Sequence, residues 1–256
     1  MNDRVPYLLG VSVRPDRVHS DAYPFNLSRI RSLDLQFTSA ATFFVGENGT
    51  GKSTVMEGLA ALCRLPVSGG SRNELAAHHG PDAASPLAPA LRPAFRRRPP
   101  DGYFLRAEFQ AHFASLLDAR KEDPDFMGDP YERYGSRSLH TRSHGEAFLA
   151  ILQNRIRRGL FLFDEPESAL SPQRQLVLLA HMSALVATGA AQFVIATHSP
   201  ILLTLPGAQI LSFDGDSVLP IGLEETSHYQ ITRGILQNPA VYWKHLRAEG
   251  EARSRE

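Results

Sequence analysis

The apolar residues of this chain follow two periods, and each period predicts a different kind of element. Apolar runs at 8–13, 30–37 and 42–45 predict strands, and the last is apolar enough to be buried on both faces. Apolar residues at helical spacing then predict a helix over 52–65, which ends before Pro66. The first quarter of the chain therefore predicts strands, a glycine-rich turn and a helix.

The second half of the chain predicts a βαβ unit with a helix before it. Two apolar strands at 160–163 and 193–196 flank a segment whose leucines have helical spacing over 172–188. A further helix is expected from residue 143 to about 156. A hairpin is expected over 210–221, and two helices should follow it. The chain should close with a charged, disordered tail over 249–256.

Residues 66–142 show no sustained apolar period. Their Pro, Gly and Ala content and the arginine run at 96–98 predict a surface excursion over 66–101. A strand at 103–108 and a helix at 109–120 are expected next, before a second polar loop. We therefore expect one domain over residues 1–256, with an insertion and helical lobe at 66–142.

Composition and charge narrow the class of protein. Of the 256 residues, 43% are hydrophobic and 21% are charged, which excludes collagen-like, low-complexity and wholly disordered chains. Basic and acidic residues balance at 27 each, so contact with nucleic acid would need a local patch. Cys63 is the single cysteine, which excludes an internal disulfide or a Cys-based zinc site. We expect a cytoplasmic protein without membrane insertion, because no signal pattern or membrane-length apolar run is present.

The strongest local signal lies between the strand at 42–45 and the helix after it. Residues 46–53 read GENGTGKS and satisfy the pattern G-x-x-x-x-G-K-[ST] in a strand-to-helix context. Such a loop turns backbone N–H groups inward, and the helix N-terminus adds a positive dipole end, so a polyphosphate fits. Lys52 would reach the β- and γ-phosphates, and the Ser53 hydroxyl would ligate Mg²⁺. The expected nucleotide-binding residues here are Gly46, Glu47, Asn48, Gly49, Thr50, Gly51, Lys52, Ser53 and Thr54.

Two further strand ends carry residues suited to a triphosphate. Asp164 and Glu165 follow the strand at 160–163, where a cation would compensate such a buried pair. Asp164 suits a magnesium ligand, and Glu165 suits a base that accepts a proton from water. His198 follows the strand at 193–196 at the same expected sheet edge, where ligands of parallel sheets bind. His198 would sense the terminal phosphate; a capping or packing role is the alternative.

In this order, GENGTGKST, LFLFDEPESALSP and ATHSP resemble the ATPase domain of the ABC superfamily, and more narrowly the stand-alone AAA-family or SMC/RecF-like ATPases. The resemblance implies an α/β fold of the P-loop NTPase type. That fold is a three-layer sandwich with a mostly parallel central sheet, an N-terminal antiparallel β portion and a helical or loop insertion. It also implies ATP and Mg²⁺ as cofactors. Lys52 and Glu165 would be catalytic, with His198 as the switch histidine and Asp164 as the magnesium carboxylate.

In this family, a serine-glycine motif of one subunit covers the γ-phosphate held by the other subunit. Ser143 and Gly145, in the sequence SHGE, are the candidates, and the motif departs from the familiar LSGGQ. A serine followed three residues later by glutamate at a helix start is also a capping box, which needs no nucleotide. Both interpretations stay open, because a capped helix N-terminus is itself an anion site.

The same resemblance gives three smaller expectations. Ser171 lies in the family's D-loop and would also cap the next helix, with Pro172 at its first position. Tyr23 or Phe25 would stack on adenine, and nothing in the spacing chooses between them. Gln110 would sense Mg²⁺.

Three functions follow as hypotheses. The first is an ATP-hydrolysing switch that forms an ATP-dependent homodimer and acts on an unidentified protein partner. The second is a nucleotide-gated module that binds DNA or protein, with Arg92 and residues 96–98 as the phosphate-contacting patch. The third is the nucleotide-binding subunit of an ABC transporter, which would need a membrane partner.

Overall fold

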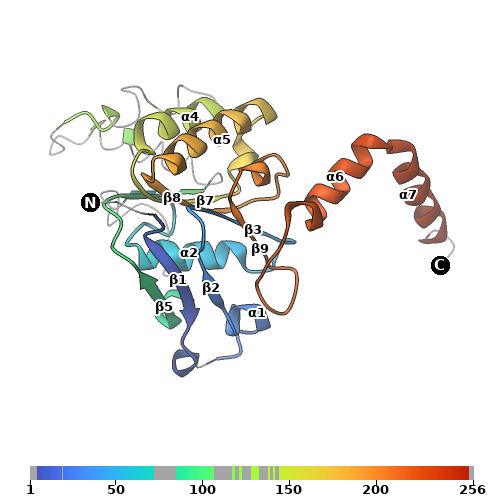
Figure 1. Cartoon of the computed structure of the whole chain (residues 1–256), viewed down its shortest axis with the longest axis horizontal. Coiled ribbons are helices and arrows are strands. Elements are labelled where there is room, and N and C mark those ends of the chain that lie inside the picture. Colours follow the sequence, from blue (N-terminus) through green and yellow to red (C-terminus); the bar gives the residue numbers. More distant parts are fainter. Residues whose placement is uncertain are drawn as a thin grey trace.

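The computed structural model describes residues 5–18, 20–71, 85–106, 117–118, 121–122, 128–132, 138, 141 and 144–253. Within these residues, seven strands form a central sheet in the order β10-β9-β3-β8-β7-β6-β4, and three form a second sheet in the order β2-β1-β5. Helices cover one face of the central sheet, while a helix and the small sheet cover the other (Figure 1). The molecule is therefore built in three layers.

The strands and helices have the following bounds. The central sheet consists of β3 (Ala41–Val45), β4 (Gly70–Ser71), β6 (Gly102–Arg106), β7 (Gly159–Asp164), β8 (Ala191–Ala196), β9 (Gln209–Ser212) and β10 (Leu219–Pro220). The small sheet consists of β1 (Leu8–Val13), β2 (Asp34–Gln36) and β5 (Leu91–Phe95). The helices are α1 (Ser28–Arg31), α2 (Lys52–Leu62), α4 (His144–Arg155), α5 (Pro172–Ala187), α6 (Ser227–Gln237) and α7 (Pro239–Arg253).

The inner strands of the central sheet run parallel, and their register aligns their carboxyl ends. β3 pairs in parallel with β8 and β9, and β7 pairs in parallel with β6 and β8. The short edge strands β4 and β10 are antiparallel. Asp164 lies opposite Ala196 on one side and Arg106 on the other. This arrangement confirms the expected α/β fold with a mostly parallel sheet and an antiparallel β portion, and it brings the ends of β3, β7 and β8 to one edge.

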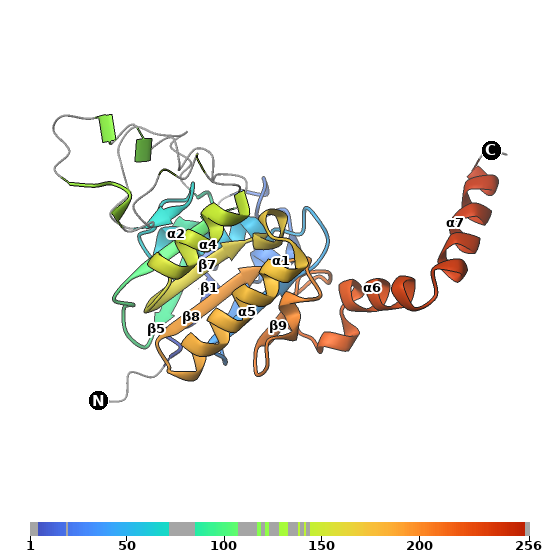
Figure 2. The same ribbon diagram turned by 90° about the horizontal axis from the view of Figure 1, so that it is seen from above.

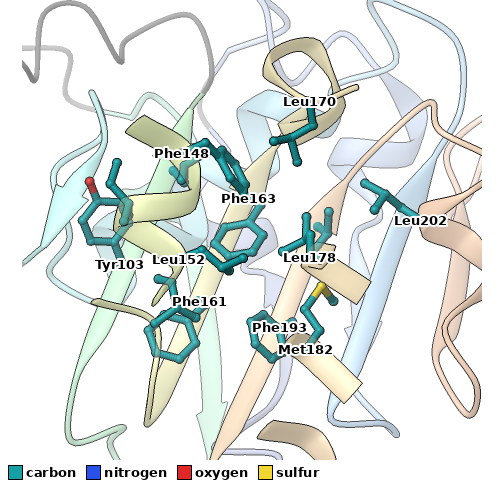
Figure 3. Packing of buried hydrophobic residues seen from close by; sticks show 14 of the residues in the cluster. Tyr103, Phe148, Leu152, Phe161, Phe163, Leu170, Leu178, Met182, Phe193 and Leu202 are labelled. Carbon is teal, nitrogen blue, oxygen red and sulfur yellow. The ribbon is translucent and has the colours of Figure 1, made fainter. Parts of the chain in front are cut away.

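Alternate residues of the inner strands enter two separate cores. On β7, Phe161 and Phe163 pack with Phe193 beneath α4 and α5, as Figure 3 shows. Leu160 and Leu162, which alternate with them, face α2 and the small sheet on the other side. Because side chains alternate along a strand, both halves of the pattern must be apolar when both faces are covered. This explains why the sequence of β7 is apolar throughout.

One buried glutamine joins the two sheets. The Gln192 side chain, on β8, accepts hydrogen bonds from the backbone N–H of Tyr7 at 2.8 Å and of Leu8 at 2.9 Å. Its Nε2 donates to the Leu8 carbonyl at 2.9 Å. Tyr7, Leu8 and Gln192 are all fully buried, so water cannot replace these hydrogen bonds. Gln192 therefore supplies the partners that the start of β1 needs.

The expected strand over 30–37 is wrong in its first half. Residues Ser28–Arg31 form the helical turn α1, and the strand is confined to Asp34–Gln36. Ile30 and Leu33 are both buried, and their spacing of three residues suits a helical turn. From Leu33 the buried positions alternate as a strand requires, at Leu35 and Phe37.

Two expectations for the less regular segments also need correction. The surface excursion over 66–101 contains β5, which pairs antiparallel with β1 and forms the edge of the small sheet. Pro93 and Arg92 disguise this strand in the sequence, but an edge strand tolerates proline because one side needs no backbone partner. At the other end of the chain, α7 continues to Arg253, so residues 249–253 are helical rather than a disordered tail. Their Glu, Ala and Arg are good helix formers that extend an existing helix.

Helices α6 and α7 extend away from the layered body, as Figures 1 and 2 show from two directions. Several large apolar side chains on them are exposed, and they include Trp243, the only tryptophan in the sequence. In the described part of the chain, no helix combines the length and the apolar character that crossing a bilayer requires. We call α6 and α7 together the C-terminal arm.

Candidate functional site

The glycine-rich loop spans the gap between the end of β3 and the start of α2. Gly46 and Gly51 have φ angles of 142° and 96°, which L-residues with side chains rarely adopt. A Cβ on Gly51 would lie 2.9 Å from Ile30 Cδ1, and one on Gly46 would lie 3.1 Å from Phe213 Cβ. These glycines are therefore required both for the backbone conformation and for the close packing beneath the loop.

Lys52, the first residue of α2, curls back over this loop. Its buried side chain donates from Nζ to the carbonyl oxygens of Gly46 at 2.5 Å and Glu47 at 3.0 Å. Burial lowers the pKa of Lys52, and this effect is opposed by the nearby carboxylates of Glu165, Asp214, Asp164 and Glu47. Among the described residues these carbonyls are its hydrogen-bond acceptors, so a third N–H remains for a phosphate oxygen.

Ser53 and Asp164 come together although 111 residues separate them. The Ser53 hydroxyl donates to Asp164 Oδ1 at 3.2 Å. On the other side of the carboxylate, Arg106 Nε lies 3.6 Å from Asp164 Oδ2, and Arg106 Nη1 lies 2.8 Å from Glu57 Oε1. Hydroxyl and carboxylate oxygens are the ligands that Mg²⁺ prefers, and it commonly takes few protein ligands beside phosphate oxygens and water. The pair fits a magnesium ion bound together with a nucleotide.

Glu165 and His198 face each other across the ends of β7 and β8. Glu165 has the left-handed backbone angles φ 50° and ψ 54°, a conformation that costs about 1 kcal/mol or more for a residue with a side chain. Its side chain is 45% exposed, and Oε1 lies 3.5 Å from His198 Nε2. Strained backbone of this kind is common where a side chain is aimed for function.

His198 has a second partner on its other ring nitrogen. His198 Nδ1 and His228 Nε2, on α6, are 2.8 Å apart. Burial lowers the pKa of His198, as does the charge of Lys52, while Glu165, Glu47 and Asp214 act in the opposite direction. The pKa of His228 is lowered by burial and by His198. Burial thus disfavours the charged form of both rings.

Four residues at this edge escaped the sequence analysis. Glu167 accepts hydrogen bonds from the Thr197 hydroxyl at 2.8 Å and the His198 backbone N–H at 2.6 Å, and burial raises its pKa. Asp214 accepts from the Glu47 N–H at 2.8 Å, beneath the glycine-rich loop. The others are His228 and Arg106.

Sequence signals existed for some of these four residues. Glu167 stands two residues after Glu165, and Asp214 follows an apolar strand, so the rule applied to Asp164 would have found both. Arg106 is the last residue of β6 and could be found in the same way. His228 does not follow an apolar strand, so its position at the site could not be predicted from the sequence pattern.

The remaining expected residues have mixed positions. The Tyr23 hydroxyl is hydrogen-bonded to the Thr54 hydroxyl, whereas Phe25 packs against the core beneath α2. Gly145 is buried in the first turn of α4, and a Cβ there would lie 2.9 Å from Arg174 Cζ. Ser143 and Gln110 lie outside the described residues.

Ser171 is the N-cap of α5, as expected. Its hydroxyl accepts a hydrogen bond from the Arg174 N–H at 3.4 Å, and Pro172 occupies the first helical position. The structure thus gathers Lys52, Ser53, Asp164, Glu165 and His198 at the carboxyl edge of the sheet.

Part of the chain that carries this site is similar to a known protein family. Residues 146–204, which include the Asp164-Glu165 pair and His198, match the family model described as "AAA domain, putative AbiEii toxin, Type IV TA system". No curated protein matched the sequence.

Several solved structures have a similar course of the chain. One is cbiO1 from Clostridium perfringens, part of the ABC transporter complex cbiONQ, with 14% identity, a TM-score of 0.48 and coverage of 95% of this chain and 100% of that chain. Another is the SMC head domain from Thermotoga maritima, with 12% identity, a TM-score of 0.44 and coverage of 85% and 100%. The segment that matches the family model is thus similar to an AAA domain, and it carries the ends of β7 and β8 that form one side of the site.

Proposed function

We propose that the protein binds ATP with Mg²⁺ at the glycine-rich loop and hydrolyses it, and that two ATP-bound copies pair as a switch acting on a partner protein. One observation supports this most directly. The lysine, the serine-carboxylate pair, the half-exposed glutamate and the histidine come from three strand ends and meet at one edge.

Lys52 and the loop would hold the phosphates. The backbone N–H groups at the start of α2 carry the positive end of the helix dipole, and the Lys52 ammonium adds a full charge. Partial burial strengthens this attraction, because less water competes with the phosphate oxygens. Ser53 and Asp164 would hold Mg²⁺, which when bound neutralises charge on the phosphates.

Glu165 would act as the base. Its carboxylate accepts a proton from a water molecule as the water oxygen attacks the γ-phosphorus, and the bond from this phosphorus to the bridging oxygen of ADP breaks. The products are ADP and inorganic phosphate. The exposed position of Glu165 leaves room for that water, and His198 Nε2 lies within reach of the same region.

The substitution Glu165→Gln tests this role. We expect kcat for ATP hydrolysis to fall about 100-fold or more, because the amide cannot accept the proton. The dissociation constant for ATP, measured by calorimetry, should stay within about threefold, since Lys52 and the loop are intact. Size-exclusion chromatography with ATP should then show a dimer, because the bound nucleotide persists.

The exposed Glu224 provides the matched control, and Glu224→Gln should hydrolyse ATP like the wild type. A wild-type rate in Glu165→Gln would disprove the base role. A monomer under saturating ATP would disprove the pairing while leaving hydrolysis intact.

A further inference from the structure

The C-terminal arm reaches the site through one side chain. His228 is the second residue of α6, and its Nε2 lies 2.8 Å from His198 Nδ1, with ring centroids 4.9 Å apart. The helix begins there because the Thr226 hydroxyl accepts from the Tyr229 N–H at 3.3 Å. The start of α6 is thus fixed, and His228 with it.

The direction of this hydrogen bond decides the tautomer of His198. Between two neutral imidazoles, one nitrogen donates and the other accepts. If His228 Nε2–H donates, then His198 Nδ1 is the acceptor and the proton of His198 resides on Nε2. In the reverse direction, His198 Nε2 is a bare acceptor.

The surroundings of His198 Nε2 favour the first direction. This nitrogen is shielded from water and has no hydrogen-bond partner among the described residues, while Glu165 Oε1 lies 3.5 Å away. An ionised carboxylate only accepts hydrogen bonds, so an N–H facing it is attracted and a bare lone pair is repelled. The proton therefore belongs on His198 Nε2, and the donor of the pair is His228.

Burial disfavours the charged form of both rings, and the surrounding charges modify this effect. The groups that act on them are Lys52, Glu165, Glu47 and Asp214, and Glu167 holds the backbone N–H of His198. Burial and Lys52 lower the pKa of both histidines, and the carboxylates only counteract this.

We propose that His228 is a positioning residue of the ATPase. By donating from Nε2 to His198 Nδ1, it holds the His198 ring with Nε2–H directed at Glu165 and the terminal phosphate, which makes α6 part of the nucleotide site. This inference rests on the proposed function, because the phosphate is the group that Nε2–H would contact.

Two substitutions of His228 distinguish a role in orienting the His198 ring from a role in packing alone. His228→Gln keeps an N–H donor at about the reach of Nε2, and His228→Leu removes it. We expect kcat of His228→Leu to fall on the order of 10-fold to 100-fold, as for a lost orienting partner, with KM for ATP within about threefold. His228→Gln should retain most of the wild-type kcat, since the donor is what matters.

His181, on α5, provides the matched control, because its Nε2 is also hydrogen-bonded, in this case to the Ile156 carbonyl at 2.8 Å. His181→Leu should leave kcat unchanged. Equal losses in His228→Gln and His228→Leu would assign His228 to packing and overturn the positioning role.

A nucleotide-free measurement tests the tautomer directly. In long-range ¹⁵N–¹H spectra of histidine-labelled full-length protein, His198 should be protonated at Nε2 in the wild type and become a mixture in His228→Leu. Protonation at Nδ1 in the wild type would overturn the inference.

The two proposals fail in different ways. Wild-type kcat in His228→Leu, beside a dead Glu165→Gln, would overturn the inference alone. Absence of ATP hydrolysis by the wild type would overturn the proposed function and leave the tautomer measurement to decide on His228.

Discussion

Two glutamates that are two residues apart have opposite surroundings. Glu165 stands half exposed on left-handed backbone, whereas Glu167 is turned into the protein, where it receives the Thr197 hydroxyl and the His198 N–H. Burial raises the pKa of Glu167, so the folded state favours its protonated form more than the unfolded chain does. Glu165 therefore suits chemistry, and Glu167 suits holding the end of β8.

The stability that Glu167 contributes should depend on pH in a definite direction. Because its folded pKa is raised, the contribution is complete below the unfolded pKa and is lost as pH rises through the folded pKa. As pH rises above about 4, the ordinary pKa of a glutamate, the free energy of unfolding of Glu167→Gln should therefore rise relative to the wild type. Glu167→Ala should lose about 1–3 kcal/mol at low pH, since two donors lose their acceptor. Urea unfolding at several pH values measures both, and a pH-independent difference would contradict the burial argument.

The residues that the sequence predicted share one property. Lys52, Asp164, Glu165 and His198 each directly follow an apolar strand or loop motif, so the parallel topology alone brings them to one edge. His228 has no such signal, because its place depends on how a hairpin and a 3₁₀ turn bring the start of α6 beside His198. Local pattern therefore predicts the strand-end residues, and tertiary packing decides the others.

At the scale of elements, the small sheet is joined to the central sheet by side-chain bonds as well as by apolar packing. Gln192 satisfies two N–H groups and one carbonyl at the start of β1. The edge strand β5 was hidden in the sequence by its proline and arginines, while the inner strands were evident from continuous apolar runs. Strands covered on both faces are thus easier to predict than edge strands, whose composition is set by water on one side.

Replacing Gln192 with leucine should destabilise the protein by about 3 kcal/mol or more. The apolar side chain fits a buried position, but it leaves three backbone groups without partners, and each costs about 1–3 kcal/mol. Chemical denaturation measures the change. The control is Gln36→Leu, whose Nε2 donates to the exposed Asp34 Oδ1, an acceptor that water can satisfy, so its cost should stay within about 1 kcal/mol. Equal costs at the two positions would argue against the joining role.

At the scale of the whole molecule, the candidate site lies where both cores meet. The strands that carry it contribute to the core beneath α4 and α5 and to the core beneath α2. A ligand that binds these strand ends in the folded state alone stabilises the entire fold, since neither core forms without the sheet.

Adding ATP with Mg²⁺ should therefore raise the melting temperature of the wild type. At a ligand concentration about 100 times the dissociation constant, the gain is about 2.7 kcal/mol. Lys52→Ala should abolish most of this shift, because the buried ammonium no longer meets the phosphates. Lys244→Ala, on exposed α7, should preserve it. Differential scanning fluorimetry with an extrinsic dye measures the shift, and a full shift in Lys52→Ala would contradict the proposed phosphate contact.

The motion of the C-terminal arm can be followed by tryptophan fluorescence. Its exposed Trp243 is the sole indole in the chain, and it lies on the part that projects farthest from the layered body in Figures 1 and 2. Emission excited at the red edge of tryptophan absorption arises from this helix and from no other element. Time-resolved depolarisation of the unlabelled protein thus records how fast the arm tumbles, separately from the bulk of the molecule.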